Sequence, residues 1–347
     1  MYTAKLVARR TFGVFEAEQP TPAAGEVLVR ADGVGICRSD IHYYQNGRIG
    51  DSVVTYPFTL GHETVGTVVA HGPGVKRPGI GTRVAIEPGI GCGQCEWCER
   101  GDPNLCAHIR FHGSPPVEGT TCGFFTHPAH LCIPLADGLS IDDGIMLEPL
   151  AIGVHTNRLL KTRPGDIVAV FGCGPVGLMN LAVAYASGAE RIIAIDLLEH
   201  RLSHARRYGA WETIMPRGDS TDVVAEVMRL TNGRGVDVAI EATSDPAVPA
   251  QAVNIAALGA RVGLIGITDE TDVMLPSHVA RRKGITVRFV RRSKLAVYAA
   301  MGLVTSGKIT LDGLVTHHFP LAEVQRGFEL VESYSDNVFK AVVLPNE

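Results

Sequence analysis

The chain lacks a long hydrophobic run and has no excess of positive charge. No uncharged apolar stretch in its 347 residues reaches the roughly 20 residues that a membrane-spanning helix needs. Lysine and arginine total 32 against 36 for aspartate and glutamate, so the net charge is −4 and provides no basic field for a nucleic-acid backbone. The first residues also lack the apolar core of a secretory signal. We therefore expect a cytoplasmic protein that has neither membrane nor nucleic acid as a partner.

Aromatic residues are also scarce, at 6% of the chain, whereas hydrophobic residues as a whole make up 46% and charged residues 20%. A chain of this length and composition is long enough to bury two hydrophobic cores. It has no internal repeat and no low-complexity tract. These features are typical of an ordinary globular protein with two domains.

The pattern of apolar residues changes near residue 150. Before it, short strand-like runs alternate with Pro and Gly turns, which predicts an irregular β-rich domain over 1–150. Strand-like and helical segments then alternate, which predicts a doubly wound parallel sheet over 151–284. Residues 285–347 mix strand and helix, and we expect them to return to the first domain, because chain termini often lie close together. The predicted fold class is therefore α/β.

Four of the eight cysteines lie in one short segment, with the spacing Cys-x2-Cys-x2-Cys-x7-Cys formed by Cys92, Cys95, Cys98 and Cys106. Four thiolates are the ligand set of a closed tetrahedral zinc site, which leaves no open position for chemistry. A disulfide knot or unrelated buried thiols are the alternatives. Because the chain lacks a secretory signal, we favour structural zinc. The remaining cysteines are scattered, as expected in a reducing compartment.

A glycine-rich turn follows a strand-like apolar run and opens a helix. It contains Gly172, Gly174 and Gly177, and a second strand-like run ends in Asp196, 19 residues beyond the last glycine. This arrangement predicts a dinucleotide site, with the pyrophosphate at the helix N-terminus and the aspartate at the adenosine ribose. The carboxylate would repel a 2′-phosphate, so we expect NAD rather than NADP. Arg201 lies close by in sequence and could bind a 2′-phosphate, but with Asp196 present we expect it to cover the adenosine end. A glycine turn without a ligand is the alternative.

Cys37, His62, Glu63 and Glu148 are a second candidate for metal binding. Cysteine, histidine and glutamate together form the mixed ligand set of a catalytic zinc that keeps one position for water or substrate. Spacing alone does not connect these residues, and a lone histidine or cysteine is more often part of a core.

Taken together, these motifs resemble the zinc-containing medium-chain dehydrogenase/reductase superfamily, and within it the polyol branch of sorbitol and xylitol dehydrogenases. The resemblance covers essentially the whole chain and is carried by segments that begin at Gly35, Leu60, Gly91, Ser114, Glu148, Gly172 and Leu314. It implies a GroES-like β-rich catalytic domain that the last segment completes, a Rossmann domain for NAD, and an active site in the cleft facing that domain. It also suggests a homo-oligomer, either a dimer or a tetramer.

The resemblance implies roles for individual residues. The catalytic zinc is expected at Cys37, His62 and Glu63, with Glu148 beside the metal through water or as a direct ligand. Asp40 would orient His62. The proton relay and substrate contacts are expected at Ser39, His42, Tyr43, Glu148 and Arg292. The matching cofactor positions are Arg38, Gly172, Gly174, Val176, Gly177, Asp196, Arg201, Ile265, Gly266, Ile267, Val290, Arg291 and Arg292.

The expected activity is oxidation of a secondary hydroxyl of a polyol to a ketone, with NAD and two zinc ions per chain. Three departures from the family pattern alter the size or charge of the substrate pocket: Val290-Arg291-Arg292-Ser293, Thr121-Cys122-Gly123 and His112. The substrate could therefore instead be an inositol, a sugar acid or an amino alcohol. A non-catalytic NAD sensor with two structural zinc ions is the alternative of a different class.

Overall fold

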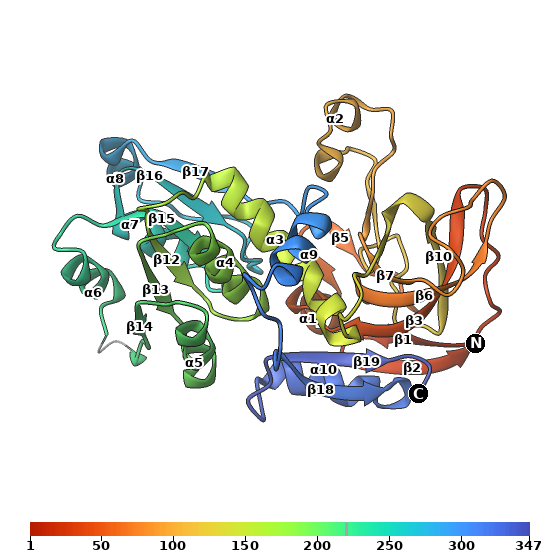
Figure 1. Cartoon of the computed structure of the whole chain (residues 1–347). Coiled ribbons are helices and arrows are strands. Elements are labelled where there is room, and N and C mark those ends of the chain that lie inside the picture. The colour runs from red at the N-terminus through yellow and green to blue at the C-terminus, as the bar shows by residue number, and fades with distance from the viewer. Residues whose placement is uncertain (219–220) are drawn as a thin grey trace. The chain divides into compact units, whose positions relative to one another are not determined.

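The computed structural model describes residues 1–218 and 221–347. The chain forms two compact units: Met1–Glu148 together with Val297–Glu347, and Pro149–Ala296 (Figure 1). Within the described residues, no helix combines the length and the apolar character needed to cross a membrane. Helix α3 (Ile141–Leu160) contains Pro149, the residue at which the second unit begins.

The first unit is built on a sheet whose strand order is β11-β7-β6-β3-β19-β18, with β10 also pairing with β3. The strands are β3 (Glu26–Gly35), β6 (Glu63–His71), β7 (Arg83–Ile86), β10 (Phe124–Pro128), β11 (Cys132–Pro134), β18 (Val315–Pro320) and β19 (Lys340–Leu344). Smaller pairs are β1 (Tyr2–Ala8) with β2 (Thr11–Glu16), β4 (Arg48–Ile49) with β5 (Ser52–Val53), and β8 (Gly89–Ile90) with β9 (Arg110–Phe111). Its remaining helices are α1 (Arg38–Asn46), α2 (Glu96–Glu99), α9 (Val297–Thr305) and α10 (Val324–Ser333), with short 3-10 turns at Pro103–Leu105, Ala129–Leu131 and Leu321–Glu323.

The C-terminal segment completes the sheet of the first unit. Strand β19 runs antiparallel to β3, with Val342 opposite Gly35, and Figure 1 shows it beside α10 and β18. Apolar residues of α10 and β19, including Phe328 and Val343, share one hydrophobic cluster with Leu6 and Ile41 from the N-terminal part. The first unit therefore takes its core from two parts of the sequence.

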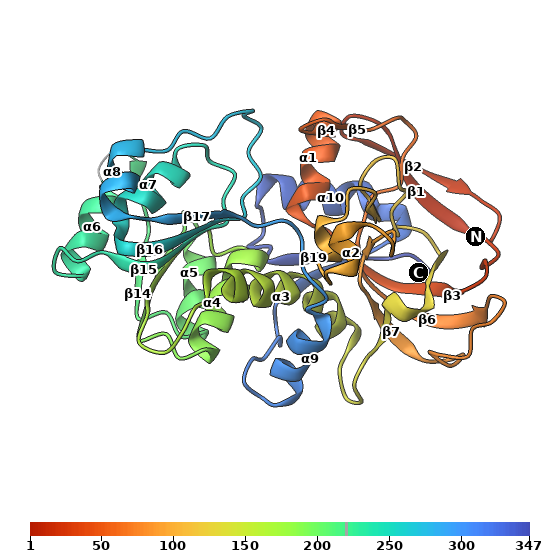
Figure 2. The same cartoon turned by 90° about the horizontal axis from the view of Figure 1, so that it is seen from above.

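The second unit is a six-stranded parallel sheet in the order β14-β13-β12-β15-β16-β17. Its strands are β12 (Ile167–Phe171), β13 (Arg191–Ile195), β14 (Glu212–Ile214), β15 (Val236–Glu241), β16 (Ala256–Leu264) and β17 (Thr286–Phe289). Its helices are α4 (Pro175–Ala186), α5 (Glu199–Arg207), α6 (Val223–Leu230), α7 (Val248–Ile255) and α8 (Ser277–Lys283). Figure 2 shows α7 and α8 on one face of the sheet and α4 on the other.

In chain order this strand arrangement is 3-2-1-4-5-6, the doubly wound arrangement of Rossmann domains, so the predicted α/β fold class is confirmed. One boundary differs from the expectation. The return segment was expected from residue 285, but β17 pairs with β16 in the parallel sheet, with Thr286 opposite Arg261. The second unit therefore extends to Ala296 and the return segment begins at Val297.

Candidate functional site

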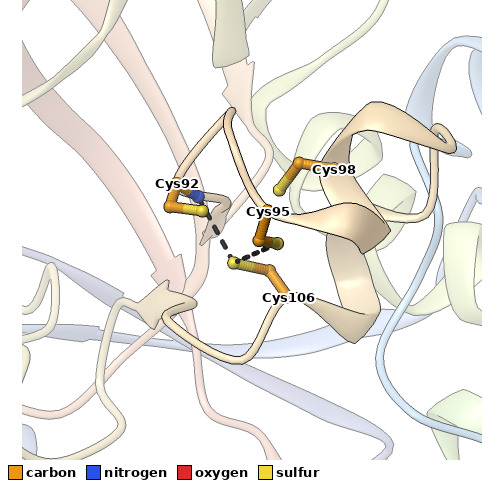
Figure 3. Close-up of side chains that lie close together, drawn as sticks. All are labelled: Cys92, Cys95, Cys98 and Cys106. Atoms are coloured by element: carbon orange, nitrogen blue, oxygen red, sulfur yellow. Dashed lines mark hydrogen bonds between the residues drawn. The ribbon is translucent and has the colours of Figure 1, made fainter.

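The four clustered cysteines meet in one loop between β8 and β9. Their sulfur atoms all lie within 4.8 Å of one another, and Figure 3 shows Cys92, Cys95, Cys98 and Cys106 pointing toward a common centre. The Sγ atoms of Cys95 and Cys106 are 3.7 Å apart. The backbone N–H groups of Cys92 and His108 donate to the Sγ of Cys106, at 3.4 and 3.3 Å. All four are free thiols, so the donor set fits a closed tetrahedral zinc site.

The backbone also favours the thiolate that a metal needs. Cys95 precedes the first residue of α2, and a hydrogen bond from the backbone of Cys98 is the main cause that lowers the pKa of Cys95 to about 6. The cluster therefore favours the thiolate form at Cys95, whereas burial raises the pKa of Cys98 to about 11.

Cys37, His62 and Glu63 form the second group, although 24 residues separate the first two in sequence. One ligand atom from each lies within 4.8 Å of the others. Cys37 is the N-cap of α1, and Gly61, with φ of +98°, turns the chain into β6 so that His62 and Glu63 lie next to it. Asp40 connects the two segments: its Oδ2 accepts from the Cys37 N–H at 3.0 Å, and its Oδ1 accepts from the Gly61 N–H at 3.2 Å.

Asp40 also lies 3.4 Å from the Nδ1 of His62, as expected for a carboxylate that orients a metal ligand. Burial alone would lower the pKa of His62. Interactions with Asp40 and Cys37 outweigh it and raise this pKa well above its ordinary value. A metal ion that binds this ring therefore competes with a proton.

The two carboxylate oxygens of Glu63 differ in their partners. Its Oε2 lies 2.6 Å from the Nζ of Lys340, and both side chains are almost fully buried. Its Oε1 is buried without a hydrogen-bond partner among the described residues. An unpaired buried carboxylate oxygen beside a thiol and an imidazole fits a metal ion. Glu148, at the end of the first unit, is half-buried. Burial raises its pKa to about 7, with Glu63 also raising it and His62 opposing both.

Lys340 was missed by reasoning from sequence. It interrupts the otherwise apolar run Phe339–Leu344, and a lysine inside a buried strand is the signal that could have identified it.

Helix α1 carries the other residues expected around this metal. Ser39 lies in its first turn and His42 is 2% exposed. The guanidinium of Arg38 lies over the ring of Tyr334, 5.1 Å from the ring centroid. Its Nε and Nη1 are buried without hydrogen-bond partners among the residues that the structure describes. A planar cation in this state is suited to binding an anion.

The hydroxyl of Tyr43 belongs to a small polar cluster that the sequence did not indicate. It lies 3.1 Å from the Oγ atoms of both Ser52 and Ser114. Phe111, three residues before Ser114, packs its ring against that of His62 with centroids 5.4 Å apart. The loop that holds Phe111 and Ser114 therefore contacts both an expected metal ligand and an expected substrate residue.

All the expected cofactor residues except Arg38, which is in α1 of the first unit, belong to the second unit. Gly172 has φ of +81°, and a Cβ at Gly177 would collide with the carbonyl oxygen of Gly172, so both positions require glycine. Asp196 follows β13 and accepts from the N–H of Cys173 at 2.7 Å, while Arg201 lies 3.7 Å from the same oxygen. The aspartate therefore ties the glycine loop to the second strand, and its remaining lone pairs are available to ribose hydroxyls.

The other cofactor positions follow the same edge of the parallel sheet. Gly174 is the N-cap of α4 and Val176 lies in its first turn. Ile265, Gly266 and Ile267 follow β16, and Val290, Arg291 and Arg292 follow β17. A Cβ at Gly266 would collide with the carbonyl oxygen of Thr243. Ligands bind to open α/β sheets beyond the carboxyl ends of their strands, so this edge fits a dinucleotide.

The chain matches two family models. Residues 23–137 match the alcohol dehydrogenase GroES-like domain, and residues 175–306 match the zinc-binding dehydrogenase model. A sorbitol dehydrogenase from Bacillus subtilis is 36% identical over 321 residues, which cover 92% of this chain and 90% of the relative. A probable D-xylulose reductase A from Arthroderma otae is 37% identical, with 91% of this chain and 90% of the relative covered.

Solved structures agree with this match. An alcohol dehydrogenase from Thermus sp. ATN1 superposes with a TM-score of 0.90 at 30% identity and covers 99% of both chains. A 2R,3R-butanediol dehydrogenase from Bacillus subtilis has a TM-score of 0.88 at 30% identity, again with 99% of both chains covered.

Proposed function

This chain belongs to the zinc-containing medium-chain dehydrogenase/reductase superfamily, and from that premise we propose that it oxidises a secondary hydroxyl of a sorbitol-like or xylitol-like polyol to a ketone. The observation that carries the proposal is the mixed group of Cys37, His62 and Glu63, in which a buried carboxylate oxygen has no hydrogen-bond partner among the described residues. A purely structural site would satisfy its ligands without an open position. The polyol relatives support the substrate class.

The chemistry is divided between bound groups and side chains. When bound, zinc supplies Lewis acidity that makes a substrate hydroxyl more acidic, and NAD supplies the hydride acceptor. Asp40 holds the ring of His62 in orientation, and Lys340 holds one oxygen of Glu63 and leaves the other unpaired among the described residues. Ser39 and His42 are assigned to carrying away the hydroxyl proton.

Glu148 and Tyr43 are assigned to the neighbouring hydroxyls of the substrate. Glu148 is half-buried with a pKa raised to about 7, so it accepts a hydrogen bond from a substrate hydroxyl as a carboxylate and donates one when protonated. A substrate without that hydroxyl would leave this half-buried group unpaired, at a cost of about 1–3 kcal/mol or about tenfold to a hundredfold in kcat/KM. Arg292 is assigned to the substrate and Arg38 to the cofactor.

Asp196 supports the choice of NAD. Its buried carboxylate beside the glycine loop would repel a 2′-phosphate, and Arg201 is already engaged with that carboxylate. The exposed Phe289 on the edge strand β17 is consistent with a homo-oligomer, and the free thiols are consistent with the cytoplasm.

The experiment is a substrate panel assayed by the absorbance of NADH. We expect kcat/KM for xylitol or sorbitol to exceed that for 2-butanol by about tenfold or more. Glu148→Gln should lower turnover with little effect on the Kd for NADH. Equal or better turnover of 2-butanol would replace the polyol assignment with a general alcohol dehydrogenase, and preference for an inositol would change only the substrate. Absence of NADH formation with every alcohol by the zinc-loaded protein would favour the NAD sensor.

A further inference from the structure

Two buried histidines form a chain of hydrogen-bonding contacts between two backbone carbonyls. The Nδ1 of His112 lies 2.9 Å from the carbonyl oxygen of Glu118, and its Nε2 lies 3.0 Å from the Nδ1 of His127. The Nε2 of His127 lies 3.1 Å from the carbonyl oxygen of Glu87. His112 is 8% exposed and His127 is fully buried. The groups at both ends of this series are carbonyl oxygens, which only accept hydrogen bonds. Only the two histidine rings can therefore supply protons.

The number of protons does not match the number of contacts. Three contacts need three N–H groups, whereas two neutral imidazoles carry two. Burial lowers the pKa of both histidines, and positive charge at Arg110 lowers it further in each case. His62 also lowers the pKa of His112, and His112 and His130 lower that of His127. The backbone contact with Glu118 and the charge of Glu26 oppose the shift at His112, and the backbone contact with Glu87 opposes it at His127, but burial is the largest cause in both. The pair is therefore neutral at pH 7.

A neutral pair has two tautomeric arrangements that keep the contact between the rings. In the first, His112 donates to the carbonyl of Glu118 and accepts from His127, which leaves the Glu87 contact without a proton. In the second, His127 donates to the carbonyl of Glu87 and accepts from His112, which leaves the Glu118 contact without a proton. Arrangements in which both rings donate outward place two lone pairs 3.0 Å apart and are disfavoured.

The hydrogen-bonded series of histidines ends at Glu118, in a loop that lines the proposed site. We define the pocket loop as residues 111–118. It begins with Phe111 against the ring of His62, carries Ser114 against the hydroxyl of Tyr43, and ends at Glu118. The other end of the hydrogen-bonded series is Glu87, which directly follows β7 of the main sheet. The histidine pair thus connects the pocket loop to the sheet through side chains in the core.

We propose that His112 and His127 form a two-state tautomeric tie that positions the pocket loop, which makes His112 a positioning residue for substrate binding at the proposed site. In one tautomeric state His112 donates to the carbonyl of Glu118 in the loop. In the other, His127 donates to the carbonyl of Glu87 at the end of β7, and the carbonyl of Glu118 lacks this donor. The position of Phe111 and Ser114, and with it the substrate-facing environment of His62 and Tyr43, depends on this tie. The kinetic test of this inference rests on the proposed function, whereas the spectroscopic test does not.

The kinetic test replaces each ring by an aromatic without nitrogens. His112→Phe should raise the KM for the preferred polyol about fivefold to tenfold, because the carbonyl of Glu118 loses its donor. In His127→Phe, His112 can donate to Glu118 in every molecule, so the KM should stay within twofold of the parent value. Zinc content and the Kd for NADH should stay unchanged. The double variant should match His112→Phe, since His112 carries the hydrogen bond to the loop. A KM within twofold of the parent value in His112→Phe would overturn the proposal.

Phe125→Leu is the matched control. Phe125 packs edge-on against His112, with centroids 5.7 Å apart, and makes no hydrogen bond to the pair. This variant loosens the same core, so it should lower the unfolding midpoint without raising the KM. A KM increase equal to that of His112→Phe would attribute the effect to packing and overturn the tautomeric tie.

The second measurement does not depend on activity or on the variants being stable. In the ¹⁵N spectrum of histidine-labelled parent protein at pH 7, the ring nitrogens of His112 and His127 should show two sets of signals, or averages between protonated and bare nitrogen. Rings fixed in one tautomer, or protonated on both nitrogens, would overturn the proposal. An inactive parent would refute the proposed function, whereas this spectrum would still decide the tautomeric states.

Discussion

Lys340 and Glu63 form a buried ion pair whose partners come from opposite ends of the sequence. Burial alone would lower the pKa of Lys340, but the charge of Glu63 opposes this and the pKa is raised. The ammonium group also donates to the carbonyl oxygen of Ile36 at 3.3 Å, directly before Cys37. The pair therefore fixes one candidate metal ligand and the backbone next to another.

We expect Lys340→Met to destabilise the metal-free protein by about 3–5 kcal/mol, because it leaves the carboxylate of Glu63 buried without a counter-charge. Urea unfolding of the metal-free variant measures this loss. The combination of Lys340→Met with Glu63→Gln should recover most of it, since no charge then remains. A loss below about 1 kcal/mol would mean that the pair contributes no more than an exposed one.

The buried histidines predict a pH dependence of stability. A histidine whose folded-state pKa is lowered takes up its proton in the unfolded state near 6.5 and in the folded state only at lower pH. Their contribution is therefore complete above pH 6.5 and is lost as the pH falls below it. Replacing both His112 and His127 by phenylalanine should flatten the decline of the urea midpoint between pH 7 and pH 5. An unchanged slope in the double variant would contradict the expectation.

At the level of elements, the cysteine loop differs from its surroundings because it has almost no core. Helix α2 contains no buried residue, and Asn104 is the buried residue of the 3-10 turn that follows. Hydrophobic burial therefore contributes little to this segment, and the thiolates bound to zinc must hold it together.

We expect removal of zinc from the four cysteines to unfold this loop locally. Amide hydrogen exchange should accelerate over residues 91–107, while exchange in β12 and β15 of the other unit stays slow. Mild chelation should first remove the metal from the site of Cys37 and His62, because that site keeps an open position. Activity should then be lost while amide exchange in the cysteine loop stays unchanged. Simultaneous loss of protection across the first unit would contradict a purely local role.

Local spacing explains why some elements could be predicted and others could not. The four cysteines and the glycine loop are each contained in a short segment, so residue spacing alone indicates a metal site and a dinucleotide site. Contacts such as Lys340 with Glu63, or His112 with His127, depend on how distant strands pair, which no local pattern specifies. The boundary near 285 was misplaced for the same reason, because a short exposed strand such as β17 resembles the strands of either unit.

At the scale of the whole molecule, the two units differ in continuity. The second unit is one continuous segment with its own core, which includes Phe171, Ile193 and Val262. The first unit depends on α10, β18 and β19, since Phe319 and Phe328 fill the cluster around Ile41. Only the second unit contains all the elements that its own fold requires.

We therefore expect a fragment of residues 149–296 to fold cooperatively and to bind NADH, and a fragment of residues 1–148 to remain unfolded. Circular dichroism with thermal unfolding measures the first property, and NADH fluorescence measures the second. The matched control is the same fragment carrying Gly177→Val, which should lose NADH binding because the glycine loop cannot close. A cooperative transition in fragment 1–148 would contradict the dependence on the C-terminal segment.

The pairing of β19 with β3 has a consequence for biosynthesis. A ribosome that adds roughly 5–20 residues per second needs tens of seconds to proceed from Gly35 to Lys340, and the complete second unit is made in that interval. Until β19 emerges, the edge of β3 near Val34 has no partner and Glu63 has no counter-ion. The nascent first unit is thus open to mispairing during translation, and it can assemble its candidate metal centre only after the nucleotide unit has been synthesised.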